Sequence, residues 1–136
     1  MKFSSWSVSK GLKYKEAQSE INPNYLDYVT EYMLWREATD EWPEDPQSPG
    51  MYVQYKDANM AFFHSMLLSR IETVTGLNLL PTYTYTRIYR PGAILEKHKD
   101  RPACEVSATM LVGANYSPTW PLYIEDACIT QKLGDM

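Results

Sequence analysis

The chain has 136 residues, of which 44% are apolar and 22% are charged, and its formal net charge is −4. This composition is typical of one soluble globular domain, and the scattered basic residues do not form the positive cluster that nucleic acids need. No stretch approaches the roughly 20 apolar residues of a membrane span, and the N-terminus lacks a secretory signal pattern. With only two cysteines, Cys104 and Cys128, we expect reduced thiols and a cytoplasmic protein.

The first half of the chain predicts two helices separated by a loop. Asn22-Pro23 is typical of a helix start, because Asn caps the first N–H groups and Pro suits the first helical position. This helix is expected over 23–38. Residues 42–50 contain three prolines and a glycine, and they are expected to form a loop.

The second helix is expected over 58–75, with Asp57 as its N-cap and Gly76 at its end. Apolar residues recur along it at spacings of three and four, which predicts one face packed on a core. These residues are Met60, Phe63, Leu67, Ile71 and Val74. His64 lies beside this stripe, and a single helical histidine is expected to be structural.

From Leu79 onward the apolar period changes from 3.6 to 2 residues, which indicates β-strands. Pro91-Gly92 predicts a turn between the first two strands. The expected strands are 82–90, 94–100, 105–112, 120–125 and 129–132. The fold class is therefore predicted as α+β, a partial double-stranded β-helix (jelly roll) with the N-terminal helices packed on the sheet.

The motif His98-Lys99-Asp100 is the candidate site. In an extended strand, residues i and i+2 project to the same side, so the imidazole and the carboxylate would converge on one point. Imidazole and carboxylate are the ligands of non-haem Fe(II) in its two-histidine, one-carboxylate site, which leaves positions open for a cosubstrate. The structural alternative is a solvent-facing His-Lys-Asp at a polar strand end.

The segment from Tyr89 to Asp100 resembles the prolyl 4-hydroxylase-like branch of the iron(II)/2-oxoglutarate-dependent dioxygenases. The segments 100–109 and 120–125 are similar to the following core strands of phage and marine bacterial members, and the resemblance covers 79–136. It implies Fe(II) as cofactor, 2-oxoglutarate as cosubstrate and ascorbate as reductant. It also implies oxidative decarboxylation of 2-oxoglutarate coupled to hydroxylation of an unidentified small-molecule or peptidyl substrate.

The resemblance assigns roles to four residues. His98 and Asp100 would be the metal-binding and catalytic pair, and Tyr89, nine residues before the metal histidine, would line the cosubstrate pocket. Tyr123 would face the same pocket from a later strand. For both tyrosines the structural alternative is aromatic packing between strands.

One feature of the family is missing from the chain. The family requires a second histidine downstream, followed by a basic residue that holds the cosubstrate, and no histidine follows His98. The chain ends 38 residues later at Leu133-Gly134-Asp135-Met136, where the family has a turn into the strand with that histidine. We therefore expect residues 1–136 to be one incomplete, C-terminally truncated domain that is inactive alone.

Two other functions stay open. The first is a non-catalytic jelly-roll binding module that uses an aromatic cleft for a ligand or a partner. The second is another metal enzyme such as a cupin, although cupins usually draw a His-x-His pair from one strand. Nearby, Arg101 and Glu105 are expected to form a surface ion pair or to contact substrate, and Cys104 is expected to be a small packed residue.

Overall fold

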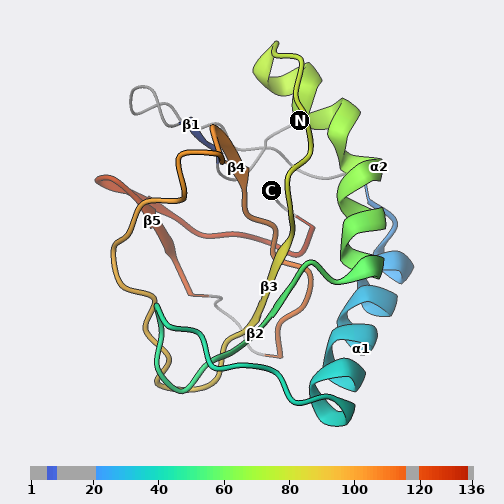
Figure 1. Ribbon diagram of the computed structural model, residues 1–136, viewed down its shortest axis with the longest axis vertical. Coiled ribbons are helices and arrows are strands. Elements are labelled where there is room, and N and C mark those ends of the chain that lie inside the picture. The colour runs from blue at the N-terminus through green and yellow to red at the C-terminus, as the bar shows by residue number, and fades with distance from the viewer. Residues whose placement is uncertain (1–5, 9–20, 116–119, 135–136) are drawn as a thin grey trace. The chain divides into compact units, whose positions relative to one another are not determined.

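The computed structural model describes residues 6–8, 21–115 and 120–134, and these contain two α-helices and six short β-strands (Figure 1). The elements are β1 Trp6–Val8, α1 Pro23–Thr39, β2 Tyr52–Tyr55, α2 Ala58–Thr75, β3 Tyr85–Ile88, β4 Val106–Ala108, β5 Leu122–Ile124 and β6 Ala127–Ile129. The prediction of an α+β protein is confirmed.

The chain divides into two compact units. Unit 1 consists of Met1–Arg36 together with Asp100–Met136, and unit 2 consists of Glu37–Lys99. The boundary within the second half of the chain therefore falls between Lys99 and Asp100, inside the His98-Lys99-Asp100 motif.

Helix α1 begins as its sequence predicts. Asn22 Oδ1 accepts a hydrogen bond from Asn24 N at 3.0 Å, and Pro23 takes the first helical position. Leu26, Val29 and Met33, at spacings of three and four, are the buried residues of the helix. A single apolar stripe of this kind is what stabilises a surface helix of a globular protein.

Helix α2, in unit 2, is capped at both ends. Asp57 Oδ1 accepts hydrogen bonds from Asn59 N at 2.9 Å and from Met60 N at 3.0 Å. At the other end Gly76 has a left-handed φ of 70°, and its N–H donates to Glu72 O at 2.8 Å. The predicted stripe is confirmed as buried at four of its five positions, Met60, Phe63, Leu67 and Ile71, and half-buried at Val74.

The two strands of unit 2 form an antiparallel pair. Tyr52 lies opposite Ile88, and Tyr55 lies opposite Tyr85. The sequence predicted β3, although over the longer range 82–90, and it did not predict β2. The turn at Pro91-Gly92 is confirmed, with Gly92 at a φ of 85° and Ala93 N donating to Arg90 O at 3.0 Å.

The strand predicted over 94–100 is wrong, because the structure has an irregular loop there. A strand needs a neighbour that satisfies its backbone groups, and the described sheet that contains β3 has β2 as its other strand and does not include residues 94–100. The carbonyl of Ile94 accepts a hydrogen bond from the side chain of Ser48, at 2.6 Å from Oγ. A fully buried serine thereby satisfies one backbone acceptor of this loop.

Unit 1 contains two antiparallel pairs. β1 pairs with β4, with Trp6 opposite Ala108, and β5 pairs with β6. β1 was not predicted, and β4 and β5 lie within the longer ranges predicted for them. β6 begins two residues before the strand predicted over 129–132 and ends at its first residue.

All three sheets in the described parts of the chain have two strands each. The jelly roll, and the packing of helices on one large sheet, therefore stay predictions. Neither helix in those parts is long and apolar enough to cross a membrane.

Candidate functional site

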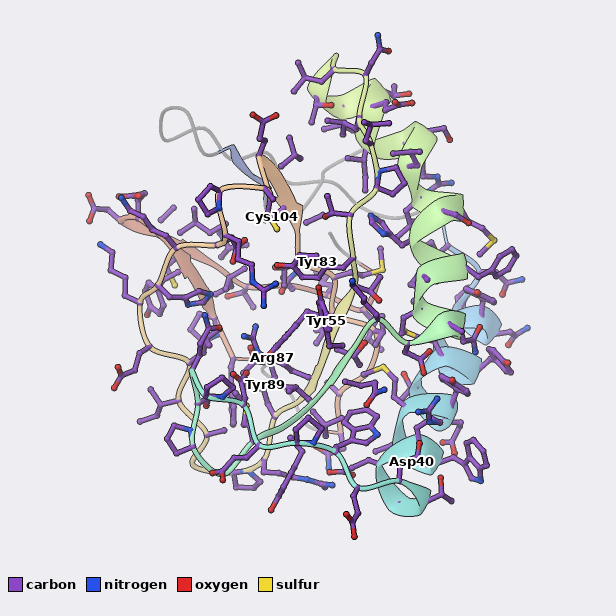
Figure 2. The ribbon with its side chains drawn as sticks, in the orientation of Figure 1. Asp40, Tyr55, Tyr83, Arg87, Tyr89 and Cys104 are labelled. Atoms are coloured by element: carbon purple, nitrogen blue, oxygen red, sulfur yellow. The ribbon has the colours of Figure 1, made fainter. Side chains whose placement is uncertain are left out.

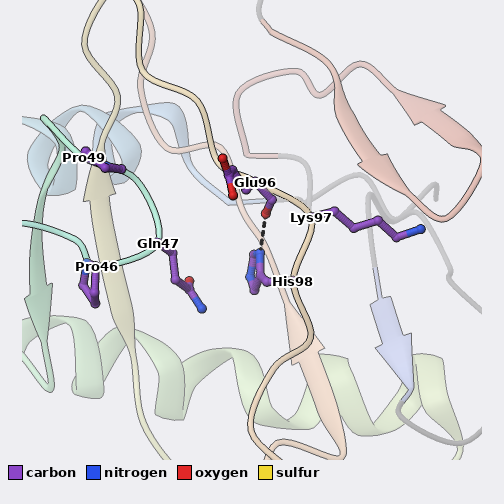
Figure 3. Close-up of a pocket in the computed structure, with 6 residues that line it drawn as sticks. All are labelled: Pro46, Gln47, Pro49, Glu96, Lys97 and His98. Atoms are coloured by element: carbon purple, nitrogen blue, oxygen red, sulfur yellow. Dashed lines mark hydrogen bonds between the residues drawn. The ribbon is translucent and has the colours of Figure 1, made fainter.

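His98 lies in the exposed loop that follows β3. Its Nδ1 is 2.8 Å from the carbonyl oxygen of Glu96 (Figure 3). Because a carbonyl only accepts hydrogen bonds, Nδ1 carries a proton, and in the neutral ring the lone pair then lies on Nε2. Metal-binding histidines are commonly oriented by such a bond to a backbone carbonyl.

Asp100 is exposed and belongs to unit 1, whereas His98 belongs to unit 2. From the sequence, the two side chains were expected to converge because residues alternate along a strand. Because residues 94–100 form no strand, that alternation does not act here. The structure thus does not bring the two predicted ligands together through a strand.

His98 lines a shallow pocket of about 260 Å³ within unit 2 (Figure 3). Its walls come from the loop before β2 and the loop after β3, and consist of Pro46, Gln47, Pro49, Glu96, Lys97 and His98. Figure 3 shows the Gln47 side chain extending toward the His98 ring and the Lys97 side chain directed away from both. Neither Tyr89 nor Asp100 is part of these walls.

A buried ion pair joins the first of these loops to β3. The Asp45 residue is 1% exposed, and Arg87 Nε donates to its Oδ2 at 2.6 Å. Gln47 N donates to Asp45 Oδ1 at 2.9 Å, and Tyr85 Oη lies 3.4 Å from the same atom. Both carboxylate oxygens therefore have partners, as a buried carboxylate requires.

The pKa of Asp45 lies below its ordinary value. Burial alone would raise it, but the hydrogen bonds from Arg87 and from Gln47 N, together with the Arg87 charge, outweigh burial. Asp45 is consequently held in its ionised form, and the pair carries no net charge.

Arg87 connects this carboxylate to two further side chains. Its Nη2 donates to Gln47 Oε1 at 2.7 Å, and its guanidinium carbon lies 4.5 Å from the centre of the Tyr85 ring. The Arg87 charge also acts on Tyr89, two residues later, where it opposes the rise in the pKa of that phenol (Figure 2 labels both residues). The planar guanidinium suits this arrangement, because it can donate in several directions at once.

Tyr89, the predicted cosubstrate contact, directly follows β3 and is 42% exposed. Burial of its surroundings raises the pKa of Tyr89, and the charge and hydrogen bond of Arg87 oppose that rise. Its phenol thus stays protonated and remains a hydrogen-bond donor at neutral pH.

Tyr123, the second predicted contact, lies on β5 in unit 1 and is 66% exposed. It is opposite Cys128 on β6, and a hydrogen bond with that thiol raises the pKa of Tyr123. Cys104 is half-buried and Arg101 and Glu105 are exposed. Cys104 and Cys128 are not joined in a disulfide.

His64 is half-buried on α2, and burial lowers its pKa. A histidine that burial keeps neutral on a packed helix matches the structural role expected from the sequence. It also provides a matched control for His98, because the chain has only two histidines.

The donor chemistry fits Fe(II) only in part. His98 supplies an imidazole oriented by a carbonyl, and Asp100 supplies a carboxylate. Within the residues that the structure describes, no group of three His, Cys, Asp or Glu side chains is arranged to hold a metal ion. A facial triad needs three such ligands.

The cluster formed by Asp45, Gln47 and Arg87 was not predicted from the sequence. One signal was present, because the predicted strand places Arg87 on one face with Tyr85 and Tyr89, and a cation that packs among aromatic rings favours a counter-charge nearby. The partner carboxylate lies 42 residues earlier, within the loop 42–50, and no local pattern joins the two.

Comparisons with protein-family models, with curated protein sequences and with solved structures found no match.

Proposed function

We propose that the chain carries part of the site of a non-haem iron dioxygenase, which couples oxidative decarboxylation of 2-oxoglutarate to hydroxylation of a substrate. The observation that carries the proposal is the His98 imidazole, oriented through Nδ1 by the Glu96 carbonyl and lining a pocket. The resemblance of residues 89–100 to the prolyl 4-hydroxylase-like branch supports the same function.

In this proposal His98 and Asp100 hold the metal, and the Glu96 carbonyl fixes the imidazole ring so that Nε2 presents its lone pair. Fe(II), with 2-oxoglutarate and O2, supplies the oxidising power for hydroxylation when bound. Tyr89 donates its phenolic O–H to a carboxylate of the cosubstrate, and Tyr123 is a second contact. A jelly roll would be the fold in which these residues meet, and the antiparallel pairing of every described sheet supports it.

The proposal is tested by measuring succinate formed from 2-oxoglutarate in the presence of Fe(II), ascorbate and O2. Because the described residues offer two ligands, added imidazole stands in for a third nitrogen ligand. We expect the chain to form succinate above a protein-free control only when imidazole is added. His98→Ala and Asp100→Asn should lower this rate at least about ten-fold, since even groups behind the ligands contribute that much at metal sites.

The control variants are His64→Ala and Asp27→Asn, which change the other histidine and an exposed carboxylate on α1. Both should retain the rate. Absence of succinate in the unmodified chain with imidazole, or an unchanged rate in His98→Ala, would count against the proposal.

A non-catalytic binding module is the second candidate. The pocket favours it, because its two proline rings and one amide offer apolar and hydrogen-bonding surface that needs no metal. Binding of a ligand at this pocket, without metal-dependent turnover of 2-oxoglutarate, would favour the binding module over the dioxygenase.

A further inference from the structure

The orientation of the Gln47 amide can be assigned from its partner. Arg87 Nη2 lies 2.7 Å from Gln47 Oε1. A guanidinium has N–H donors and no acceptor, so the amide atom that faces it must be the oxygen. The amide NH2 group of Gln47 consequently points away from Arg87.

Arg87 itself is held by a group that cannot easily move. The Asp45 side chain is completely buried, and it binds Arg87 Nε at 2.6 Å. The ring of Tyr85 lies against the guanidinium at 4.5 Å. A buried carboxylate thus holds a guanidinium, and the guanidinium binds the amide oxygen of the exposed Gln47 residue.

The amide that is bound in this way belongs to the pocket of His98. Gln47 and His98 both line it, and Figure 3 shows the Gln47 side chain extending toward the His98 ring. The prolines on the same loop, Pro46 and Pro49, contribute rings that have no N–H group. The Gln47 NH2 group is therefore placed to donate into the pocket.

We propose that Arg87 is a positioning residue of this pocket: anchored on Asp45, it turns the Gln47 amide so that its N–H groups donate to a ligand oxygen beside His98. The ligand class is an oxygen acceptor, either a carboxylate or an uncharged carbonyl. This role of Arg87 rests on the proposed function in one respect: the ligand is taken to share the pocket with a metal-binding histidine.

The first arm of the test measures the mobility of the Gln47 side-chain amide by 15N relaxation in the metal-free chain. We expect an order parameter near that of rigid backbone, about 0.8, and a fall below about 0.6 in Arg87→Lys and Asp45→Asn. Lysine keeps the positive charge but lacks the planar fork. Arg90→Lys is the matched control, because Arg90 binds Glu37 within the same unit and should leave Gln47 rigid. A rigid Gln47 amide in Arg87→Lys would overturn the proposal.

The second arm follows the Gln47 amide resonances while succinate, or separately N-methylacetamide, is added to the metal-free chain. Succinate has carboxylates and no ketone, so shifts with succinate alone identify a carboxylate ligand, and shifts with N-methylacetamide identify an uncharged carbonyl. Arg87→Lys should weaken binding about five-fold, the value of one hydrogen bond, and Arg90→Lys should not. Resonances of Gln47 that do not respond to either compound would contradict the proposal. Neither arm contains iron. A negative result in either arm would therefore count against the role of Arg87 and Gln47, and not against iron binding at His98.

Discussion

The two units differ in how far apart in the sequence their partners lie. Unit 2 is one continuous segment, 37–99, whereas unit 1 joins the N-terminal segment to the C-terminal one. In unit 2 a buried ion pair, a four-residue strand pair and a helix with both ends capped lie within 63 residues. In unit 1 the pairing of Trp6 with Ala108 must close a loop of about one hundred residues, which costs more chain entropy. The comparison indicates that the partners in unit 2 lie within about 40 residues of one another, whereas those in unit 1 lie up to about one hundred residues apart.

The largest expected effect is on unit 2. Replacing Asp45 by alanine leaves the Arg87 guanidinium, whose side chain is 18% exposed, without its buried counter-charge. Breaking a buried pair costs about 3–5 kcal/mol, and the partial exposure of Arg87 reduces this to roughly 2–4 kcal/mol of unfolding free energy. Hydrogen exchange of the amides of β2 and β3 measures the loss.

The matched control for this variant is Glu37→Ala. Glu37 pairs with Arg90, whose side chain is 52% exposed, and such a pair contributes less than about 1 kcal/mol. Equal losses in the two variants would mean that the Asp45 pair does not organise unit 2.

The same ion pair predicts a dependence of stability on pH. The folded-state pKa of Asp45 is lowered, so its contribution is present above the unfolded-state pKa and is lost as pH falls through the folded value. We expect the unfolding free energy of unit 2 to fall on acidification below about pH 4. This dependence on pH is measured as the difference between urea midpoints at two acidic pH values. In Asp45→Asn that difference should be smaller. An identical slope in the variant would contradict the assignment.

A close approach in unit 1 gives the next prediction. A Cβ added at Gly113 would lie 2.5 Å from Thr30 Oγ1, and that hydroxyl donates to Val112 O at 2.9 Å. Gly113→Ala should therefore cost about 1–3 kcal/mol, the usual range for overpacking. Addition of Thr30→Ala should restore part of the loss, which a double-mutant cycle by urea unfolding detects. Additive losses would show that the two residues are not in contact.

The helices were predictable because their signals are local. Asn22-Pro23, Asp57 and Gly76 fix the helix ends within a few residues, and the apolar spacing identifies the buried face. β1 and β2 were missed because a strand of three or four residues has too few positions to show alternation, and its partner decides whether it forms.

The candidate site was predictable only as residue types. His98 and Asp100 have the chemistry of iron ligands, but the assumed strand between them depended on β3 pairing with 94–100. In the structure β3 pairs with β2, and residues 94–100 belong to none of the described sheets. Gln47 and Arg87 could not be joined from the sequence, since their contact spans 40 residues.

The smallest expected effect is a gain in unit 2. Lys56 is exposed and has a left-handed φ of 55°, which a residue with a Cβ adopts at a cost. Lys56→Gly should raise the unfolding free energy by about 0.5 kcal/mol, after the greater freedom of glycine in the unfolded chain is subtracted. Lys56→Ala removes the same contact with the Tyr55 ring but keeps the Cβ, so it should give no gain in thermal unfolding. A gain of the same size in Lys56→Ala would assign the effect to the side chain and not to φ.

Metal binding tests the central claim most directly. Co(II), a spectroscopic substitute for Fe(II) with similar ligand preferences, would be titrated into the chain and its visible absorption followed. The account predicts that His98→Ala and Asp100→Ala each weaken Co(II) binding at least about ten-fold. His64→Ala, the other histidine, should bind Co(II) as the unmodified chain does. Unchanged Co(II) affinity in His98→Ala would contradict the assignment of His98 as a metal ligand, and the dioxygenase proposal with it.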